Sequence, residues 1–303
     1  MYDIIIIGSG PAGLTAAVYA RRAEKTVLIL EKSSFGGQIT YSPKVENFPG
    51  EIEISGNALA EKLIDQALNL DAEIELAQVT KIEKKDRFFI VSCDTSVYES
   101  KSVIIASGSK HRKLNLPLEN EFIGNGISYC AVCDGAFFQG KEVAVIGGGN
   151  TALQDAVLLC DICKKVTIIQ NLGFFTGEKK LLDILSKRDN VSFIKDSVVT
   201  ELRGSSNLEG IVIENTKKNE KSYIAADGVF VAIGQVPENE VFSDIAQLDS
   251  NGYIISDESC TTSTPGIFAA GDCRAKSIRQ VVTASSDGAI SALAACKYID
   301  SLN

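Results

Sequence analysis

The sequence predicts an α/β fold in which parallel sheets are covered by helices. Short runs of β-branched residues alternate with helical stretches along most of the chain, the pattern of strand–helix–strand units. The chain has 303 residues, too many for one ordinary hydrophobic core and enough for two domains. Apolar residues make up 45% and charged residues 23%, as in globular rather than disordered proteins.

An internal repeat of strand, glycine-rich turn, helix and strand is the strongest signal. The first copy covers residues 3–31 and the second covers residues 142–170, so the offset is 142 − 3 = 139 residues. The pairs in register are Gly8 with Gly147, Gly10 with Gly149, Gly13 with Ala152, and Glu31 with Gln170. One GxGxxG motif is a weak signal. Two in register predict two Rossmann-like dinucleotide-binding domains.

Each glycine of the turn has its own physical role. The first permits the tight turn, and the second lets backbone N–H groups approach a pyrophosphate. The third, replaced by Ala152 in the second copy, lets the helix pack closely on the strand. The helix N-terminus adds partial positive charge. A plain strand-to-helix turn without a ligand stays open as an alternative, more so for the second copy.

A further strand and helix near the C-terminus complete the first domain. Residues 264–273 are typical of a buried strand that ends in Gly-Asp, and residues 284–299 are typical of a helix. Asp272 at that strand end suits hydrogen bonding to the ribityl hydroxyls of a cofactor. The predicted architecture is two Rossmann-like, three-layer ββα domains, the second inserted into the first. The first domain covers residues 1–111 and 241–303, and the inserted domain covers residues 112–240.

Charge and composition argue against several other functions. The net charge of −9 disfavours non-specific nucleic-acid binding. The apolar run at residues 4–7 is short and has no basic segment before it, so it predicts a buried strand rather than a signal peptide or membrane span. Eight cysteines in such a chain are expected to be mostly thiols in a reducing cytosol. We therefore expect a cytoplasmic protein with no nucleic-acid or membrane partner.

Cys130 and Cys133 form a CxxC pair, for which three interpretations compete. Half of a zinc site would need two more ligands, which would have to be Cys160 and Cys163, because His111 is the only histidine. Inert packing is the second interpretation. A redox-active pair is favoured, because the spacing suits a disulfide and a helix start stabilises a thiolate. Cys160 and Cys163 are more typical of helix packing.

Eight short motifs resemble one known family. They are, in chain order, GSGPAG, FGGQIT, VENFPG, CAVCDG, GGGNTA, AIG, GIFAAGDC and RQVV. In order and spacing they resemble the low-molecular-weight thioredoxin reductase family over nearly the whole chain. The resemblance implies an FAD-binding domain, an inserted nicotinamide-type domain carrying the CxxC pair, thioredoxin as the substrate protein, and a homodimer. No metal is implied.

The resemblance also implies roles for individual residues. Cys133 would face the flavin, Cys130 would attack the disulfide of thioredoxin, and Asp134 would be the proton donor and acceptor. Glu31 would bind the adenosine ribose of FAD. The other implied FAD contacts are Gly8, Ser9, Gly10, Pro11, Ala12 and Gly13 at the pyrophosphate, Asp272 at the ribityl chain, Arg279, Gln280 and Val281 at the isoalloxazine, and Gly37, Gln38, Asn47, Val79 and Gly108 elsewhere. We expect the inserted domain to swing, because one CxxC must meet both flavin and thioredoxin.

The second copy of the repeat departs from the family at one point. Members that use NADPH carry arginines after the second strand of the nicotinamide unit, where a guanidinium fork binds the ribose 2′-phosphate. This chain has Gln170, Asn171 and Leu172 there, and no arginine between Arg112 and Arg188. An NADH enzyme would instead have Asp or Glu at that strand end.

Because it lacks these nicotinamide-recognition residues, the chain resembles the ferredoxin-dependent flavin thioredoxin reductases. We therefore expect ferredoxin as the electron donor. An atypical NADPH or NADH site is the alternative, and a non-catalytic redox-sensing flavoprotein is an alternative of another class. Basic residues that are candidates for ferredoxin docking are Arg21, Arg22, Lys25, Lys110, His111, Arg112 and Lys113.

Overall fold

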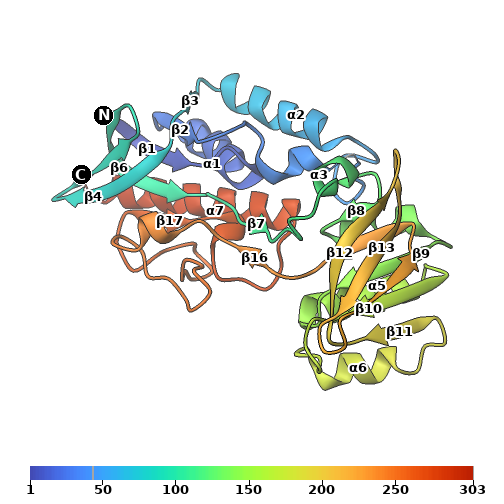
Figure 1. The fold of residues 1–303 in the computed structure, drawn as a ribbon. Helices are drawn as coiled ribbons and strands as arrows, with labels where there is room; N and C mark the ends of the chain where they lie inside the picture. The colour runs from blue at the N-terminus through green and yellow to red at the C-terminus, as the bar shows by residue number, and fades with distance from the viewer. Residues whose placement is uncertain (43, 303) are drawn as a thin grey trace. The chain divides into compact units, whose positions relative to one another are not determined.

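A computed structural model describes residues 1–42 and 44–302 of the chain. It divides into two compact units (Figure 1). Unit 1 combines Met1–Lys110 with Val236–Asn303, and unit 2 is His111–Gln235. The chain thus crosses between the units at residues 110–111 and 235–236, against predicted crossings at 111–112 and 240–241. Short strands β7 (Lys110–His111) and β16 (Gln235–Val236) pair at these crossings.

Unit 1 is built on a seven-stranded sheet. Its strands, in spatial order, are β3 (Glu73–Leu76), β2 (Val27–Glu31), β1 (Tyr2–Ile7), β6 (Val97–Ile105), β5 (Phe88–Cys93) and β4 (Val79–Lys85), with β17 (Ile267–Ala269) also pairing with β6. The pairs among β3, β2, β1, β6 and β17 are parallel, and β4, β5 and β6 form an antiparallel meander. This strand order places β1 between β2 and β6, so the turn after β1 opens beside both strand ends.

Helices cover one face of this sheet. They are α1 (Pro11–Arg22), α2 (Gly56–Leu68) and α7 (Val281–Asp300). Ile4 and Ile6 of β1 pack into the core beneath α1 and α7. Ile5 and Ile7, which alternate with them, pack on the opposite face with Phe89 of β5. Strand β1 is therefore buried on both sides, which explains its uninterrupted isoleucine run.

Short helical turns and connections complete unit 1. The 3₁₀ turns are η1 (Gly37–Tyr41), η3 (Glu240–Phe242) and η4 (Gly271–Cys273). Helix α1 starts with Pro11 at its first position and ends with Arg21 and Arg22, residues that suit those ends of a helix. Helix α7 starts with a capping box between Gln280 and Thr283.

Unit 2 has three layers. The central sheet is parallel, in the order β11 (Val191–Ile194), β10 (Lys165–Ile169), β9 (Glu142–Ile146), β15 (Gly228–Val231) and β8 (Ile127–Ser128). One face carries the helices α4 (Ala131–Asp134), α5 (Asn150–Cys160) and α6 (Lys179–Leu185) with η2 (Gly135–Phe138). The other face packs on the antiparallel sheet of β12 (Ser197–Gly204), β13 (Leu208–Asn215) and β14 (Glu220–Ala225), and on α3 (Glu119–Phe122).

The internal repeat is visible in the backbone hydrogen bonds. The Gly8 N–H donates to the Leu30 oxygen at 2.8 Å, and the Gly147 N–H donates to the Ile169 oxygen at 2.9 Å. Likewise Ala106 donates to Ile7, and Ala232 donates to Ile146, each at 2.8 Å. The predicted fold class, two Rossmann-like three-layer domains with one inserted into the other, is confirmed.

The first glycine of each turn has no room for a side chain. A Cβ on Gly8 would lie 2.3 Å from the Ala106 oxygen, and one on Gly147 would lie 2.4 Å from the Ala232 oxygen. Their φ angles are +106° and +135°, a region that favours glycine. Among the residues that the structure describes, no helix is both long and apolar enough to span a membrane.

Gly147→Ala is expected to destabilise unit 2 through both effects. Backbone strain of about 1–2 kcal/mol adds to about 1–3 kcal/mol of overpacking. Gly140→Ala is the matched control, because Gly140 has a φ of +73° but nothing within 4 Å of its would-be Cβ, so only the strain applies. Urea unfolding measures both variants. Equal losses in the two would contradict the steric argument.

Candidate active site

The CxxC pair lies at the start of a short helix in unit 2. Strand β8 leads into it, and Cys130 caps α4, accepting a hydrogen bond from the Cys133 N–H on its sulfur at 3.2 Å. The two cysteines form a disulfide with Cα atoms 5.3 Å apart. Both residues are half-buried, and Val132 between them is exposed. A disulfide that is partly open to solvent can be reached by another thiol.

Asp134 follows Cys133 in the chain, and its surroundings favour the protonated carboxyl. Its Oδ2 accepts a hydrogen bond from the Ser128 hydroxyl at 2.6 Å, while its Oδ1 is buried without a hydrogen-bond partner. Burial raises the pKa of the Asp134 carboxyl, and the Ser128 hydrogen bond partly opposes that rise. Ser128 also accepts from the Cys130 N–H at 3.1 Å, so one hydroxyl links the acid to the cysteine backbone.

The zinc interpretation has no support in the geometry. Cys160 and Cys163 are buried in the core between α5 and the sheet, and burial raises the pKa of the Cys163 thiol to about 11. Asn190 donates to the carbonyl oxygens of both residues, at 2.9 and 3.0 Å. Within residues 1–42 and 44–302, no group of three or more His, Cys, Asp and Glu is placed to hold a metal ion.

The six remaining cysteines are free thiols of low reactivity. They are Cys93, Cys160, Cys163, Cys260, Cys273 and Cys296. Burial is the largest cause of a raised pKa in each of them. Since the thiolate is the reactive form, none of the six is primed for redox chemistry.

The glycine-rich turn of unit 1 forms the predicted FAD cradle. Glu31 at the end of β2 is 8% exposed, and its Oε2 accepts from both the N–H and the hydroxyl of Ser9, each at 2.9 Å. Its Oε1 accepts from the Ser33 N–H and hydroxyl. Two of these four donors are serine hydroxyls, which can turn away when ribose hydroxyls donate instead.

The far side of this cradle comes from distant parts of the chain. A Cβ on Gly37 would lie 2.9 Å from the Gly10 Cα, and one on Gly271 would lie 2.8 Å from the Ala12 Cβ. Next to Gly271, the Asp272 Oδ1 is buried and has no hydrogen-bond partner. An acceptor left open in this way fits a ribityl hydroxyl donor, so the residues present fit FAD.

The other implied FAD contacts are placed as follows. Asn47 donates to the Gln280 side chain at 3.3 Å, and Arg279 stacks 4.1 Å from the centre of the Tyr253 ring. Val281 packs against a small hydrophobic cluster that includes Ile39. Gln38, which precedes Ile39 in the chain, is exposed. Val79 is buried at the start of β4, and Gly108 follows β6 with a φ of +70°.

Unit 2 has a cavity of about 650 Å³ where a nicotinamide nucleotide would be expected. Its lining includes the Gly147–Gly149 turn, Arg112, Gln170 and Thr176. Gln170 is 5% exposed, and its side chain is used within its own loop. Its Nε2 donates to the Phe174 oxygen at 3.3 Å, and its Oε1 accepts from the Asn171 N–H at 3.1 Å.

The loop after β10 folds back onto this second glycine-rich turn. The Gly148 oxygen accepts from the N–H groups of Thr176 and Gly177, each at 2.9 Å. Two cations lie against this loop: the Lys195 Nζ is 5.6 Å from the centre of the Phe175 ring, and the Lys217 Nζ would be 3.2 Å from a Cβ on Gly173. Lys217 also pairs with Asp196 at 2.9 Å. Ser128 and Lys217 were not predicted, because each approaches its partner only through tertiary folding.

His111 is expected to be neutral at neutral pH, and its part in docking ferredoxin stays a prediction. Burial lowers its pKa to about 4, and its ring stacks on Tyr129 with centroids 5.2 Å apart. Of the other docking candidates, Lys110 pairs with Glu238 at 2.9 Å and Lys25 pairs with Asp300 at 2.5 Å.

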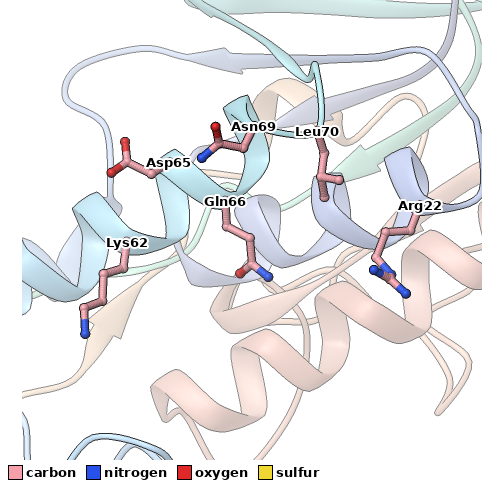
Figure 2. Close-up of a pocket in the computed structure, with 6 residues that line it drawn as sticks. All are labelled: Arg22, Lys62, Asp65, Gln66, Asn69 and Leu70. Carbon is pink, nitrogen blue, oxygen red and sulfur yellow. The ribbon is translucent and has the colours of Figure 1, made fainter.

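A second cavity, of about 470 Å³, lies beside α1 and α2 (Figure 2). Its lining residues are Arg22, Lys62, Asp65, Gln66, Asn69 and Leu70. Figure 2 shows the Lys62 amine and the Asp65 carboxylate pointing away from each other. Arg22 ends α1, whereas the FAD cradle lies at the start of that helix, about 18 Å away for 12 residues. This cavity is therefore separate from the cofactor site.

Known proteins resemble the chain over its whole length. The pyridine nucleotide-disulphide oxidoreductase family matches residues 2–288. A protein of Clostridium pasteurianum, the 34.2 kDa protein in rubredoxin operon, is 44% identical over 98% of this chain and 97% of its own. Thioredoxin reductase of Treponema pallidum is 42% identical over 99% and 98%. The crystal structure of thioredoxin reductase from Streptococcus pyogenes has a TM-score of 0.94 at 42% identity, covering 99% of each chain.

Glu31→Gln, which copies the residue at the equivalent position of the second repeat, is expected to weaken FAD binding about tenfold. Hydrogen bonds to a charged group contribute about 1.5–3 kcal/mol and neutral ones about 1 kcal/mol, a difference near 1.4 kcal/mol. FAD titration of the apoprotein measures it. Glu75→Gln on neighbouring β3, whose carboxylate accepts from Tyr98, is the control. Unchanged affinity in Glu31→Gln would contradict the ribose assignment.

Proposed function

The chain belongs to the pyridine nucleotide-disulphide oxidoreductase family, and we propose that it is a flavin-dependent thioredoxin reductase that takes its electrons from ferredoxin. Proteins of this family bind FAD, and FAD is the cofactor of this chain. When bound, it accepts electrons singly and supplies them in pairs to a disulfide. The observation that carries the proposal is the half-buried Cys130–Cys133 disulfide beside Asp134, a partly buried acid whose pKa is raised.

The two cysteines have distinct roles in the proposed reaction. Reduction of Cys130–Cys133 takes up two electrons and two protons and gives two thiols. The Cys130 thiolate then attacks the thioredoxin disulfide, whose S–S bond breaks as a mixed disulfide forms. The Cys133 thiolate attacks the Cys130 sulfur, which releases dithiol thioredoxin and restores the enzyme disulfide. A potential difference of about 30 mV, worth roughly 1.4 kcal/mol, suffices for a tenfold preference.

Asp134 is proposed to move the protons of these steps. Because its pKa is raised, its carboxyl keeps a proton to higher pH than an exposed aspartate would. It can therefore protonate a leaving thiolate and take the proton of an attacking thiol. Ser128 holds the carboxyl in place through the 2.6 Å hydrogen bond.

Ferredoxin is proposed as the donor because the end of β10 carries neither the acid that binds a ribose nor the arginines that bind a 2′-phosphate, although Arg112 and Lys113 line the same cavity. Gln170 uses both polar atoms of its side chain within its own loop, and Leu172 follows where a cation would bind a 2′-phosphate. An iron–sulfur protein delivers electrons singly, which a flavin can accept.

The runner-up is the same reductase driven by NADPH or NADH. One observation favours it, because Lys217 stands beside Gly173 in the loop that would contact the ribose phosphate. Its ion pair with Asp196 is exposed on the Lys217 side, so a phosphate could compete for the amine. A redox sensor, the alternative of another class, would carry the same disulfide but would not turn over thioredoxin.

We also propose a cytoplasmic homodimer. The exposed face of α7 presents Val282, Ile290 and Leu293, an apolar stripe that a second copy would cover. Free thiols at the six other cysteines suit a reducing compartment.

The donor is tested by following the flavin absorbance without oxygen, with thioredoxin present. Reduced ferredoxin is expected to bleach the flavin within a turnover, whereas micromolar NADPH or NADH leaves it oxidised. Reduced rubredoxin is a useful second protein donor, given the operon of one relative. Rapid bleaching by NADPH that is lost in Lys217→Met would refute the ferredoxin proposal and establish the runner-up.

Ser128→Ala is expected to move the carboxyl-dependent limb of the pH–rate profile to higher pH. The Ser128 hydrogen bond lowers the pKa of Asp134, so its removal raises that pKa further, and the proton is lost at higher pH. The profile of kcat/KM for thioredoxin measures the shift. Cys133→Ser is the control, which retains FAD but turns over no thioredoxin. A shift to lower pH would contradict the role of Asp134.

A further inference from the structure

A buried carboxylate on α7 accepts several hydrogen bonds from the segment that follows β17. Asp287 is 7% exposed. Its Oδ2 accepts from the Gly271 N–H at 3.0 Å and from the Lys276 Nζ at 2.8 Å, and its Oδ1 accepts from the Arg274 Nη1 at 2.9 Å. All three donors come from the six residues Gly271–Lys276, so a single side chain fixes both ends and the middle of this segment.

The held segment is the one that presents Asp272 to the FAD cradle. Gly271 takes a left-handed φ of +77° and starts the turn η4, and its N–H is the group that Asp287 binds. Arg274 is anchored on its other side by the Ser256 hydroxyl at 2.8 Å and by the Asp257 oxygen at 2.7 Å. A buried carboxylate needs such charged partners, because removing one leaves the others uncompensated.

Lys276 stands between two carboxylates. Its Nζ is 2.8 Å from the Asp287 Oδ2 and 3.8 Å from the Asp272 Oδ1. At the longer distance it makes no hydrogen bond, and the Asp272 Oδ1 stays without a partner. Were Asp287 neutral, the amine would be drawn to Asp272, the nearest remaining carboxylate, and would occupy the acceptor meant for the cofactor.

We propose that Asp287 is a positioning residue for FAD: it holds the Gly271–Asp272 turn in place and keeps Lys276 away from Asp272. This role rests on Asp272 as a ligand of the ribityl chain. Asp287 itself acts from beneath the turn, through Gly271 and Lys276, and contributes no contact to the cofactor in this account.

FAD titration of the apoprotein of the full chain tests the proposal, with the quenching of flavin fluorescence as readout. Asp287→Asn is expected to raise the dissociation constant for FAD at least tenfold. Adding Lys276→Met to that variant is expected to restore most of the loss, because the competing cation is gone. Equal losses in the single and double variants, with tight binding by the unchanged chain, would overturn the role of Lys276 while leaving the flavin assignment intact.

Two further variants separate positioning from general stability. Asp300→Asn lies on the same helix, where its carboxylate pairs with Lys25, and is expected to leave FAD affinity unchanged. Lys276→Met alone leaves Arg274 to compensate the Asp287 charge and keeps the Gly271 contact, so it is expected to bind FAD as the unchanged chain does, even if Asp287→Asn does not fold. A tenfold loss in Lys276→Met would mean that the lysine supports the cofactor directly, and the proposal would be wrong.

Discussion

The close approach of Gly8 to the Ala106 oxygen, and of Gly147 to the Ala232 oxygen, is the constraint on which the ligand sites depend. Each glycine follows a central strand and turns the chain so that the helix starts beside the ends of two neighbouring strands. Any side chain at these positions would displace the strand carbonyl and, with it, the end of the neighbouring strand. The position of Glu31 in one unit and of Gln170 in the other therefore follows from the same backbone geometry.

Because the two copies share this backbone, their differences are differences of side-chain chemistry. The Glu31 carboxylate accepts four hydrogen bonds. At the equivalent position of unit 2, the Gln170 amide makes its hydrogen bonds to the backbone of its own loop. A neutral group that already has partners gains little from a ribose hydroxyl. The fold of unit 2 also supports the CxxC pair, since β8 leads into the helix that carries Cys130 and Cys133 and α5 packs against it.

The sequence was sufficient to predict the fold class, because the repeat, the isoleucine run of β1 and the glycine-rich turns are local patterns typical of strand–turn–helix units. It was also sufficient for the pairing of Cys130 with Cys133, which occupy defined positions within a motif, and the ribose role of Glu31 stays a prediction. It was insufficient where a role depends on partners far along the chain. Ser128 donates to Asp134, Asp287 accepts from Gly271, and partial burial by tertiary packing lowers the pKa of His111. No local pattern reports a desolvated ring or a carboxylate shared by three donors.

The raised pKa values of the six free thiols have a consequence for the path of electrons through the molecule. Each unit by which a thiol pKa exceeds its ordinary value lowers its thiolate fraction tenfold at a given pH, and with it the rate of thiol–disulfide exchange. The Cys163 thiol, with a pKa of about 11, and the Cys260 thiol, with a pKa of about 12, are accordingly almost wholly protonated at neutral pH. Exchange between these thiols and the Cys130–Cys133 disulfide is therefore slow. Burial of the free thiols thus protects the Cys130–Cys133 disulfide from exchange with them.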